Sequence, residues 1–281
     1  MIGVRLVATD LDGTLLRRDG TLSERTVAAV DRAARAGLGV VLVTARPPRW
    51  VDDIAARLAC HPLAICSNGA LIYDVHHHRL VAEHPIPPDV SAQVLARLRA
   101  EIEGVVVAVE AGMVYGQEPA YTPSWPPPPD ALVAEAERLL AAPVAKMVVR
   151  HGESGDHWEL VDRARRAAGG LVEVTSSGPG APVELAAPGV SKAFALEIVA
   201  GQLGVKAEEV VAFGDMPNDL PMLAWAGCSI APANAHPDVL AVVDRVTADC
   251  DLDGVAMVIE EEIDAGRWGP VSPPTLGGAD E

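Results

Sequence analysis

The sequence has few aromatic and few basic residues. Aromatic side chains make up only 4% of the 281 residues, although hydrophobic residues make up 49%. The core must therefore consist mainly of Ala, Val and Leu, in one large or two modest domains. Lysine and arginine number 22 against 39 acidic residues, which gives a formal net charge of -17 at pH 7. This negative charge argues against a nucleic-acid or anionic-membrane partner.

Long apolar runs and paired cysteines are missing too. No run approaches the roughly 20 residues that a membrane helix needs, and no N-terminal segment has the three parts of a signal peptide. The cysteines are scattered without the pairing typical of a metal site. They are Cys60, Cys66, Cys228 and Cys250. We therefore expect buried free thiols in a cytoplasmic protein, because a reducing compartment keeps thiols free.

The most informative stretch begins with a short apolar run, Leu6–Thr9, which is typical of a buried strand. Two carboxylates, Asp10 and Asp12, follow at once, and then Gly13 and Thr14. Alternate residues at the end of a strand point the same way, so both carboxylates can serve one site. Such close carboxylates repel each other unless a cation or a shared proton intervenes. The pattern indicates a metal site, or a nucleophile paired with an acid.

Two other interpretations of this stretch remain. The first is a solvated, Asp-rich turn after a strand. The second is a calcium loop, which also uses Asp-x-Asp-Gly. The apolar Leu15 and Leu16 that follow Thr14 stand where a calcium loop needs further oxygen ligands.

The next segment predicts a βαβ unit. Residues 23–36 have the capping and spacing of a helix, and residues 39–44 form a continuous apolar run typical of a buried strand. This succession favours a parallel sheet. Thr44 then lies at the carboxyl end of a strand, where open α/β sheets bind ligands, although it can also cap a helix. Arg46 is a candidate for a bidentate phosphate contact or for a surface salt bridge.

A second group of polar residues lies near the C-terminal end. Lys192 opens a helix, where the helix dipole disfavours a cation, so we expect another group to hold it; an exposed lysine is the alternative. The apolar run 210–213 predicts a buried strand, and Asp215, Asn218 and Asp219 follow it. Their oxygens are of the kind that Mg²⁺ prefers.

A break in the pattern at residues 85–88 predicts a separate module. Between 86 and 188 helices and strands alternate, which indicates a small α+β layer. We expect helices over 89–103, 130–140 and 154–168, strands over 105–109, 113–115, 144–150, 171–175 and 183–185, and an irregular, proline-rich loop over 121–129. Earlier in the chain, Asn68 and Gly69 form a strong turn signal between two strands.

Asp10-Leu11-Asp12-Gly13-Thr14 resembles the first motif of the haloacid-dehalogenase superfamily of phosphohydrolases. Thr44, Lys192 and the segment Gly214–Asp219 resemble its second, third and fourth motifs. The whole arrangement is similar to the Cof-type branch, which implies an α/β fold with a Rossmann-like parallel-sheet core and an inserted α+β cap. The core then comprises 1–85 and 189–268, the cap 86–188, and a disordered tail 269–281.

The resemblance also implies roles for single residues. Asp10 is the nucleophile, Asp12 the general acid and base, and Thr44 and Lys192 hold the phosphoryl oxygens. Mg²⁺ is bound by Asp10, Asp215 and the backbone carbonyl of Asp12, with Asp219 as a further candidate. The candidates for contacts to substrate also include Arg46, Asn68, Gly69 and Asn218. Met216-Pro217 departs from the family pattern, in which glycine usually follows the metal-binding Asp.

The resemblance implies a magnesium-dependent phosphatase that hydrolyses a small-molecule phosphate monoester, such as a sugar phosphate or a similar metabolite, through an aspartyl-phosphate. The alternatives are a phosphomutase of the phosphomannomutase type and a non-catalytic phospho-ligand binding protein. Cap residues are expected to select the leaving group, but the sequence does not identify them. It does not predict an oligomeric state.

Overall fold

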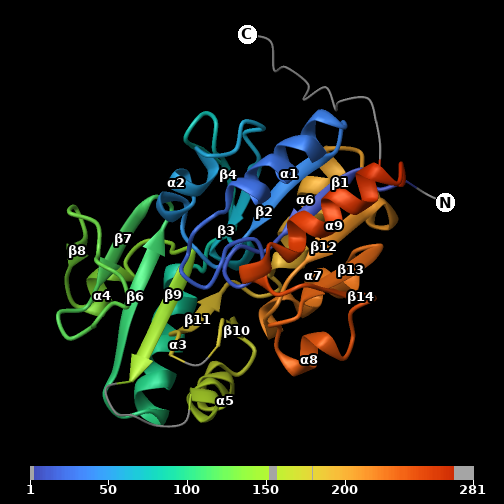
Figure 1. The fold of residues 1–281 in the computed structure, drawn as a ribbon. Coiled ribbons are helices and arrows are strands. Elements are labelled where there is room, and N and C mark those ends of the chain that lie inside the picture. The colour runs from blue at the N-terminus through green and yellow to red at the C-terminus, as the bar shows by residue number, and fades with distance from the viewer. Residues whose placement is uncertain (1–2, 152–156, 179, 269–281) are drawn as a thin grey trace.

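The structure is a computed structural model that describes residues 3–151, 157–178 and 180–268. These residues form one sheet of eight strands and one of six (Figure 1). The predicted helix over 154–168 begins outside the described residues, and the predicted tail, 269–281, lies outside them. Within the described ranges no helix is long and apolar enough to cross a membrane.

The eight-stranded sheet has the strand order β14-β13-β12-β1-β2-β3-β4-β5. Neighbouring strands from β14 to β3 are parallel, whereas β4 and β5 continue the sheet in antiparallel fashion. The strands are β1 (Leu6–Thr9), β2 (Gly39–Val43), β3 (Leu63–Cys66), β4 (Leu71–Asp74), β5 (Arg79–Glu83), β12 (Val210–Phe213), β13 (Cys228–Pro232) and β14 (Arg245–Thr247). The central part is the predicted parallel sheet.

Helices cover both faces of this sheet (Figure 1). Val7 of β1 packs into a cluster with residues of α1 and α9. Its neighbours Leu6 and Ala8 point to the opposite face and pack with residues of α6 and α7. Because alternate side chains of a buried strand reach opposite faces, a continuous apolar run serves both layers. The helices of this part are α1 (Glu24–Arg35), α2 (Asp52–Ala55), α6 (Lys192–Gln202), α7 (Leu220–Trp225), α8 (Pro237–Leu240) and α9 (Gly254–Asp264), with single 3₁₀ turns η1 (Pro48–Trp50), η2 (Ser67–Gly69), η3 (Ala207–Glu209), η4 (Pro217–Asp219) and η5 (Cys250–Leu252).

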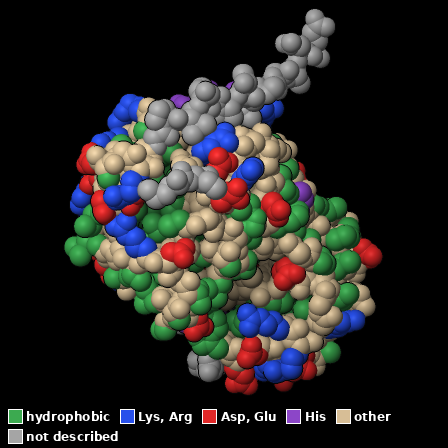
Figure 2. Space-filling view, turned by 90° about the vertical axis from the view of Figure 1, so that its right-hand side faces the viewer, with side chains coloured by type: hydrophobic (Ala, Val, Ile, Leu, Met, Phe, Trp, Pro, Cys, Tyr) green, Lys and Arg blue, Asp and Glu red, His purple; other side chains and the backbone are tan. Residues whose placement is uncertain are grey.

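Helix α1 forms where the sequence predicts it. The Ser23 hydroxyl accepts a hydrogen bond from the backbone N–H of Thr26, which satisfies a donor of the first turn. On the outer side, Arg25 pairs with Glu260 of α9 at 2.6 Å. Figure 2 shows acidic and basic side chains interspersed on one face of the molecule. Exposed pairs of this kind contribute little to stability individually.

The six-stranded sheet has the order β10-β11-β9-β6-β7-β8, and all pairs but β7 with β8 are antiparallel. All of its strands come from residues 86–188, which we call the cap segment. The strands are β6 (Val105–Ala111), β7 (Val114–Gln117), β8 (Leu132–Val133), β9 (Lys146–His151), β10 (Glu173–Thr175) and β11 (Val183–Ala186), and the helices are α3 (Pro88–Glu101), α4 (Ala136–Leu139) and α5 (His157–Ala168).

The two faces of the six-stranded sheet differ in character. Val107 and Val109 of β6 pack in one cluster with residues of α3 and α5. Ala108 points the other way and packs with Tyr115, Tyr121 and Val148. The pleat therefore gives this sheet one face covered by helices and a second face that is available to line a site.

Three features of the chain differ from the expectations. The predicted helix over 130–140 is wrong: β8 pairs there with β7, and only the short α4 is helical. The prolines at 126–129 keep the preceding chain extended, and this favours the addition of β8 as a strand at the edge of the sheet. The strands β5 and β14 and the helices α2, α7 and α8 have no predicted counterpart. All four cysteines are free thiols, as expected, but only Cys66 and Cys250 are fully buried.

Candidate active site

The candidate site lies at the carboxyl ends of three neighbouring strands. Strand β1 lies between β12 and β2, so the residues that follow these strands meet at one edge of the sheet. They include Asp10 after β1, Thr44 after β2 and Asp215 after β12. The backbone N–H of Asp10 donates to the carbonyl of Phe213 at 2.9 Å, which ties the start of the loop after β1 to the end of β12. Ligands of open α/β sheets bind at this edge.

Lys192 connects two of the carboxylates. Its ammonium lies 2.6 Å from Oδ1 of Asp10 and 2.6 Å from Oδ1 of Asp219. The side chain is buried although it begins helix α6, whose N-cap is Ser191. Burial lowers the pKa of Lys192, but the negative charges of Asp10 and Asp219 outweigh it and raise the pKa above its ordinary value. These two carboxylates hold the cation that the helix dipole disfavours.

Asp219 shapes the loop that follows β12. Its Oδ2 accepts hydrogen bonds from the backbone N–H groups of Asp215 at 3.1 Å and Met216 at 3.0 Å. The hydroxyl of Thr14 donates to Oδ1 of Asp215 at 3.1 Å. Asp219 thus fixes the backbone of this loop with one oxygen and Lys192 with the other. The Met216-Pro217 departure is accommodated, because Pro217 opens the 3₁₀ turn η4.

The cluster carries more negative than positive charge. Carboxylate oxygens of Asp10, Asp215 and Asp219 lie within 4.8 Å of one another, and all three residues are buried. Burial and the neighbouring Asp219 raise the pKa of Asp215 to about 7. Burial also raises the pKa of Asp10 well above its ordinary value, against the effect of Lys192. Three buried carboxylates around one ammonium are a donor set that fits a hard divalent cation such as Mg²⁺.

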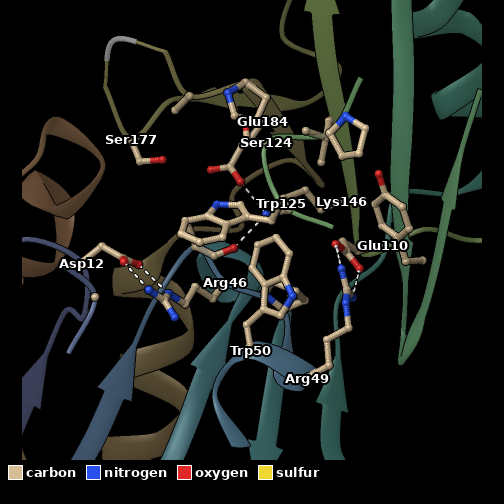
Figure 3. A pocket seen from close by; sticks show the side chains of 18 of the residues that line it. Asp12, Arg46, Arg49, Trp50, Glu110, Ser124, Trp125, Lys146, Ser177 and Glu184 are labelled. Carbon is tan, nitrogen blue, oxygen red and sulfur yellow. Dashed lines mark hydrogen bonds and ion pairs between the residues drawn. The ribbon is translucent and has the colours of Figure 1, made fainter. Parts of the chain in front are cut away.

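Asp12 faces away from this cluster. Its carboxylate is half exposed and accepts two hydrogen bonds from Arg46, from Nε at 2.8 Å and from a terminal nitrogen at 2.5 Å (Figure 3). Arg46 therefore forms a salt bridge, which is one of the two roles expected for it. A metal contact of Asp12 through its backbone carbonyl stays a prediction.

The other candidates are held by bonds within the protein. The Thr44 hydroxyl is buried and accepts from the backbone N–H of Arg46 at 3.0 Å. The Asn68 amide donates to Glu184 of the cap segment at 2.8 Å, and its oxygen accepts from Asn218 at 3.2 Å. A phosphate contact of Thr44, Asn68 or Asn218 remains a prediction.

The turn at position 69 requires a glycine for a structural reason. The φ of Gly69 is +104°, and a Cβ there would lie 2.1 Å from the carbonyl oxygen of Ser191. Only glycine allows this turn to approach the start of helix α6 so closely. Since α6 carries Lys192, the turn positions the cation next to Asp10. A substrate contact of Gly69 also stays a prediction.

A cavity of about 740 Å³ extends from these residues to the cap segment. Its lining includes Asp10, Asp12 and Asp215 on one side and the helix-free face of the six-stranded sheet on the other. Glu110 of β6 and Lys146 of β9 are register partners, and both point into the cavity with Glu184 of β11. Further lining residues are Arg49, Trp50, Tyr115, Tyr121 and Trp125.

Sequence reasoning missed these residues of the outer cavity. The strand pleat carries Glu110, Lys146 and Glu184 to one face, but their spacing in the sequence has no motif. Trp125 had a usable signal, because it stands in a proline-rich loop of a chain that is poor in aromatic residues.

Comparison with known proteins agrees with this geometry. A sequence model of the haloacid dehalogenase-like hydrolase family matches residues 7–259. The chain belongs to this family. The resemblance, the enzyme class of hydrolase and the α/β fold with a cap are thereby confirmed.

Two curated members of the family are similar over most of their length. Pyridoxal phosphate phosphatase YbhA of Escherichia coli is 30% identical over 268 residues, which cover 91% of this chain and 97% of that protein. The 5-amino-6-(5-phospho-D-ribitylamino)uracil phosphatase YitU of Bacillus subtilis is 28% identical over 270 residues, covering 91% of this chain and 96% of that protein.

Solved structures of the family share the fold. A haloacid dehalogenase-like hydrolase from Bacillus subtilis superposes with a TM-score of 0.79 at 25% identity, covering 92% of this chain and 99% of that one. A second, from Bacteroides thetaiotaomicron, gives a TM-score of 0.75 at 26% identity, with coverage of 92% and 99%.

Proposed function

We propose that this hydrolase is a magnesium-dependent phosphatase that cleaves a small-molecule phosphate monoester through an aspartyl-phosphate on Asp10. The observation that carries the proposal is the buried contact of Lys192 with Asp10 and Asp219, next to Asp215. The cation offsets the repulsion between the Asp10 carboxylate and an incoming phosphate. The adjoining cavity supplies space for the rest of the ester. Two curated relatives are named as phosphatases of small phosphate metabolites, which supports the same reaction class.

The residues divide the reaction between them. An oxygen of Asp10 attacks phosphorus in line with the ester oxygen, so that a bond from Asp10 to phosphorus forms and the ester P–O bond breaks. Asp12 gives its proton to the leaving alkoxide. It then takes a proton from the water that hydrolyses the aspartyl-phosphate, which releases inorganic phosphate and restores Asp10. Thr44 and Lys192 orient the phosphoryl oxygens.

Asp10, Asp215 and the Asp12 backbone carbonyl would hold Mg²⁺. When bound, the ion supplies positive charge that offsets the negative charge of the three buried carboxylates and reduces their repulsion of the substrate phosphate. Asp219 acts in this scheme mainly by holding Lys192 and the loop after β12.

The test is phosphate release from a broad panel of phosphomonoesters, with Mg²⁺ and with EDTA. We expect release from some esters in Mg²⁺ only, and its loss in Asp10→Asn, which keeps the shape of the nucleophile but not its charge. Asp162→Asn, an exposed acid in α5, is the matched control and should behave as the unaltered protein. Mass spectrometry of the quenched reaction should find one phosphoryl group on the peptide that contains Asp10.

Two outcomes would support other functions. Conversion of a sugar phosphate into its isomer without free phosphate would indicate a phosphomutase. Binding of phosphate esters by folded protein without turnover of any of them would indicate a non-catalytic binder, and would overturn the proposed function.

A further inference from the structure

Four of the few aromatic residues of this chain line one cavity. The sequence contains only ten of them, five Trp, three Tyr and two Phe. Four line the outer part of the single cavity described above: Trp50, Tyr115, Tyr121 and Trp125. Trp50 comes from the eight-stranded part and the other three from the cap segment. The two parts of the fold thus meet in one aromatic wall, defined by these four residues and Arg49.

Four planar groups of the aromatic wall lie next to one another in a row. The guanidinium of Arg49 lies 5.2 Å from the centre of the Tyr115 ring and 5.1 Å from that of Trp50. The rings of Trp50 and Trp125 follow, with centroids 6.2 Å apart and planes tilted by 58°. Figure 3 shows both indoles between the Asp12–Arg46 pair and the Arg49–Glu110 pair. The wall therefore runs from the phosphate end of the cavity toward its far end.

The wall is held in place by its surroundings. Its two tyrosines, Tyr115 and Tyr121, pack in a small apolar cluster with Ala108 and Val148 of the six-stranded sheet. Trp125 is flanked by Ser124, whose hydroxyl accepts a hydrogen bond from Arg150, and by the first of four consecutive prolines. Such a loop loses little conformational freedom on binding. Trp125 is nevertheless 62% exposed, so much of its ring stays open to solvent although its centre lies 6.2 Å from that of Trp50.

Four charged side chains that the two sheets and the turn η1 bring to the outer cavity form two ion pairs. Arg49 donates to both oxygens of Glu110, at 2.8 Å and 2.6 Å. Lys146 pairs with Glu184 at 2.5 Å and donates to the Ala45 carbonyl at 2.8 Å. The charges of these two cations and two anions cancel in pairs, and of the Arg49 donors only Nε is left without a hydrogen-bond partner. A polyhydroxylated sugar needs free donors and acceptors around its ring, whereas a flat aromatic ring needs apolar faces.

We infer that the leaving group of the substrate carries a flat aromatic ring, which stacks on Trp125 and Trp50 while the phosphate lies at Asp10. This inference rests on the proposed function for the phosphate end and adds the class of leaving group. Trp125 is then a specificity residue. It acts by contact with the ring and takes no part in the bond-breaking step.

The test compares two esters that differ in one respect. Benzyl phosphate and cyclohexylmethyl phosphate share the CH₂–O–P linkage and nearly the same size, but only the first has a flat ring. We expect kcat/KM to be about tenfold higher for benzyl phosphate, the value of one good aromatic contact. Trp125→Leu should bring the ratio close to one, and Trp125→Phe should retain most of it. A substitution that only perturbed the fold would lower kcat/KM for both esters by the same factor.

Binding provides a readout that does not depend on turnover. Benzylphosphonate and cyclohexylmethylphosphonate, which lack the bridging oxygen, should show the same preference in calorimetry, and Trp125→Leu should remove it. If no phosphomonoester of the broad panel or of this pair is hydrolysed but the phosphonates keep this preference, the proposed function fails and the aromatic subsite stands. Equal kcat/KM for the two esters, a ratio unchanged in Trp125→Leu, or a higher kcat/KM for glucose 6-phosphate than for benzyl phosphate would overturn the inference.

Discussion

Arg46 holds the Asp12 carboxylate in a two-point contact, with Nε 2.8 Å from Oδ2 and a terminal nitrogen 2.5 Å from Oδ1. The backbone N–H of Arg46 is bonded in turn to the hydroxyl of Thr44. Arg46, in the loop after β2, thereby sets the direction of the Asp12 side chain in the loop after β1. Bidentate pairs of this kind fix geometry as well as charge. Asp12 is the proposed acid, so its direction matters for proton transfer.

We predict that Arg46→Ala affects esters according to their leaving group. Loss of the contact lets Asp12 turn, so kcat for an alkyl phosphate should fall about tenfold. A nitrophenyl phosphate has a leaving group that needs no proton, and its kcat should change little. Steady-state kinetics on both esters measures this, with Arg25→Ala of the α1 surface as control. An equal fall for both esters would instead show that Arg46 binds the phosphate.

Removal of the Lys192 charge should destabilise the protein in a pH-dependent way. Lys192→Met leaves buried carboxylates without their cation, and we expect a loss of about 3 kcal/mol in the free energy of unfolding at pH 8. The raised pKa of Asp10 and of Asp215 means that the folded protein takes up protons as pH falls. Protonation removes the repulsion, so the loss should shrink by pH 5.5.

Urea unfolding without Mg²⁺ at the two pH values measures this loss. Lys206→Met is the control, because the Lys206 side chain is 76% exposed. A loss of the same size at pH 8 and pH 5.5 would contradict the electrostatic origin of the effect.

Binding of Mg²⁺ should compete with a proton on Asp215. Burial and Asp219 raise the pKa of Asp215 to about 7, so much of the metal-free protein carries a proton there below this pH. The apparent binding constant should therefore fall at least tenfold for each pH unit below 7, because the pKa of Asp10, the other carboxylate ligand, is raised too. Calorimetry in buffers of different ionisation enthalpy should detect at least one proton released near pH 6.

A second acidic group provides the control for this experiment. Asp249, Cys250 and Asp251 also come within ligand distance of one another, but Asp251 is exposed and paired with Arg18. Asp251→Asn should leave Mg²⁺ binding unchanged, whereas Asp215→Asn should abolish it. Binding that is independent of pH between 5.5 and 8 would argue against Asp215 as a ligand.

The turn at Gly69 should be intolerant of any side chain. Gly69→Ala places a Cβ 2.1 Å from the Ser191 carbonyl oxygen, and we expect a loss of stability of about 3 kcal/mol. Gly104 also has a positive φ, of +72°, but open space around it. Gly104→Ala should cost only about 1 kcal/mol. Chemical denaturation of both variants compares strain alone with strain plus collision, and equal losses would refute the close approach as the cause.

Much of the architecture was predictable from local patterns. Continuous apolar runs such as Val210–Phe213 predict strands buried on both faces, and the capping of the helix after Ser23 is a matter of neighbouring residues. The failure at residues 130–140 has the opposite origin, since β8 is a strand only because β7 offers it an edge. No pattern within that segment contains this information.

The candidate site divides in the same way. Asp10 and Asp12, and likewise Asp215 and Asp219, are close in sequence at the ends of strands, so the order of residues was enough to predict that carboxylates would gather and that Lys192 needed a partner. Which way Asp12 turns depends on the fold, because Arg46 comes from a neighbouring loop and holds Asp12 away from the cluster. The fold also brought Glu110, Lys146 and Glu184 to one face and Trp125 next to Trp50, because these contacts depend on strand register and on how the two sheets meet across the cavity.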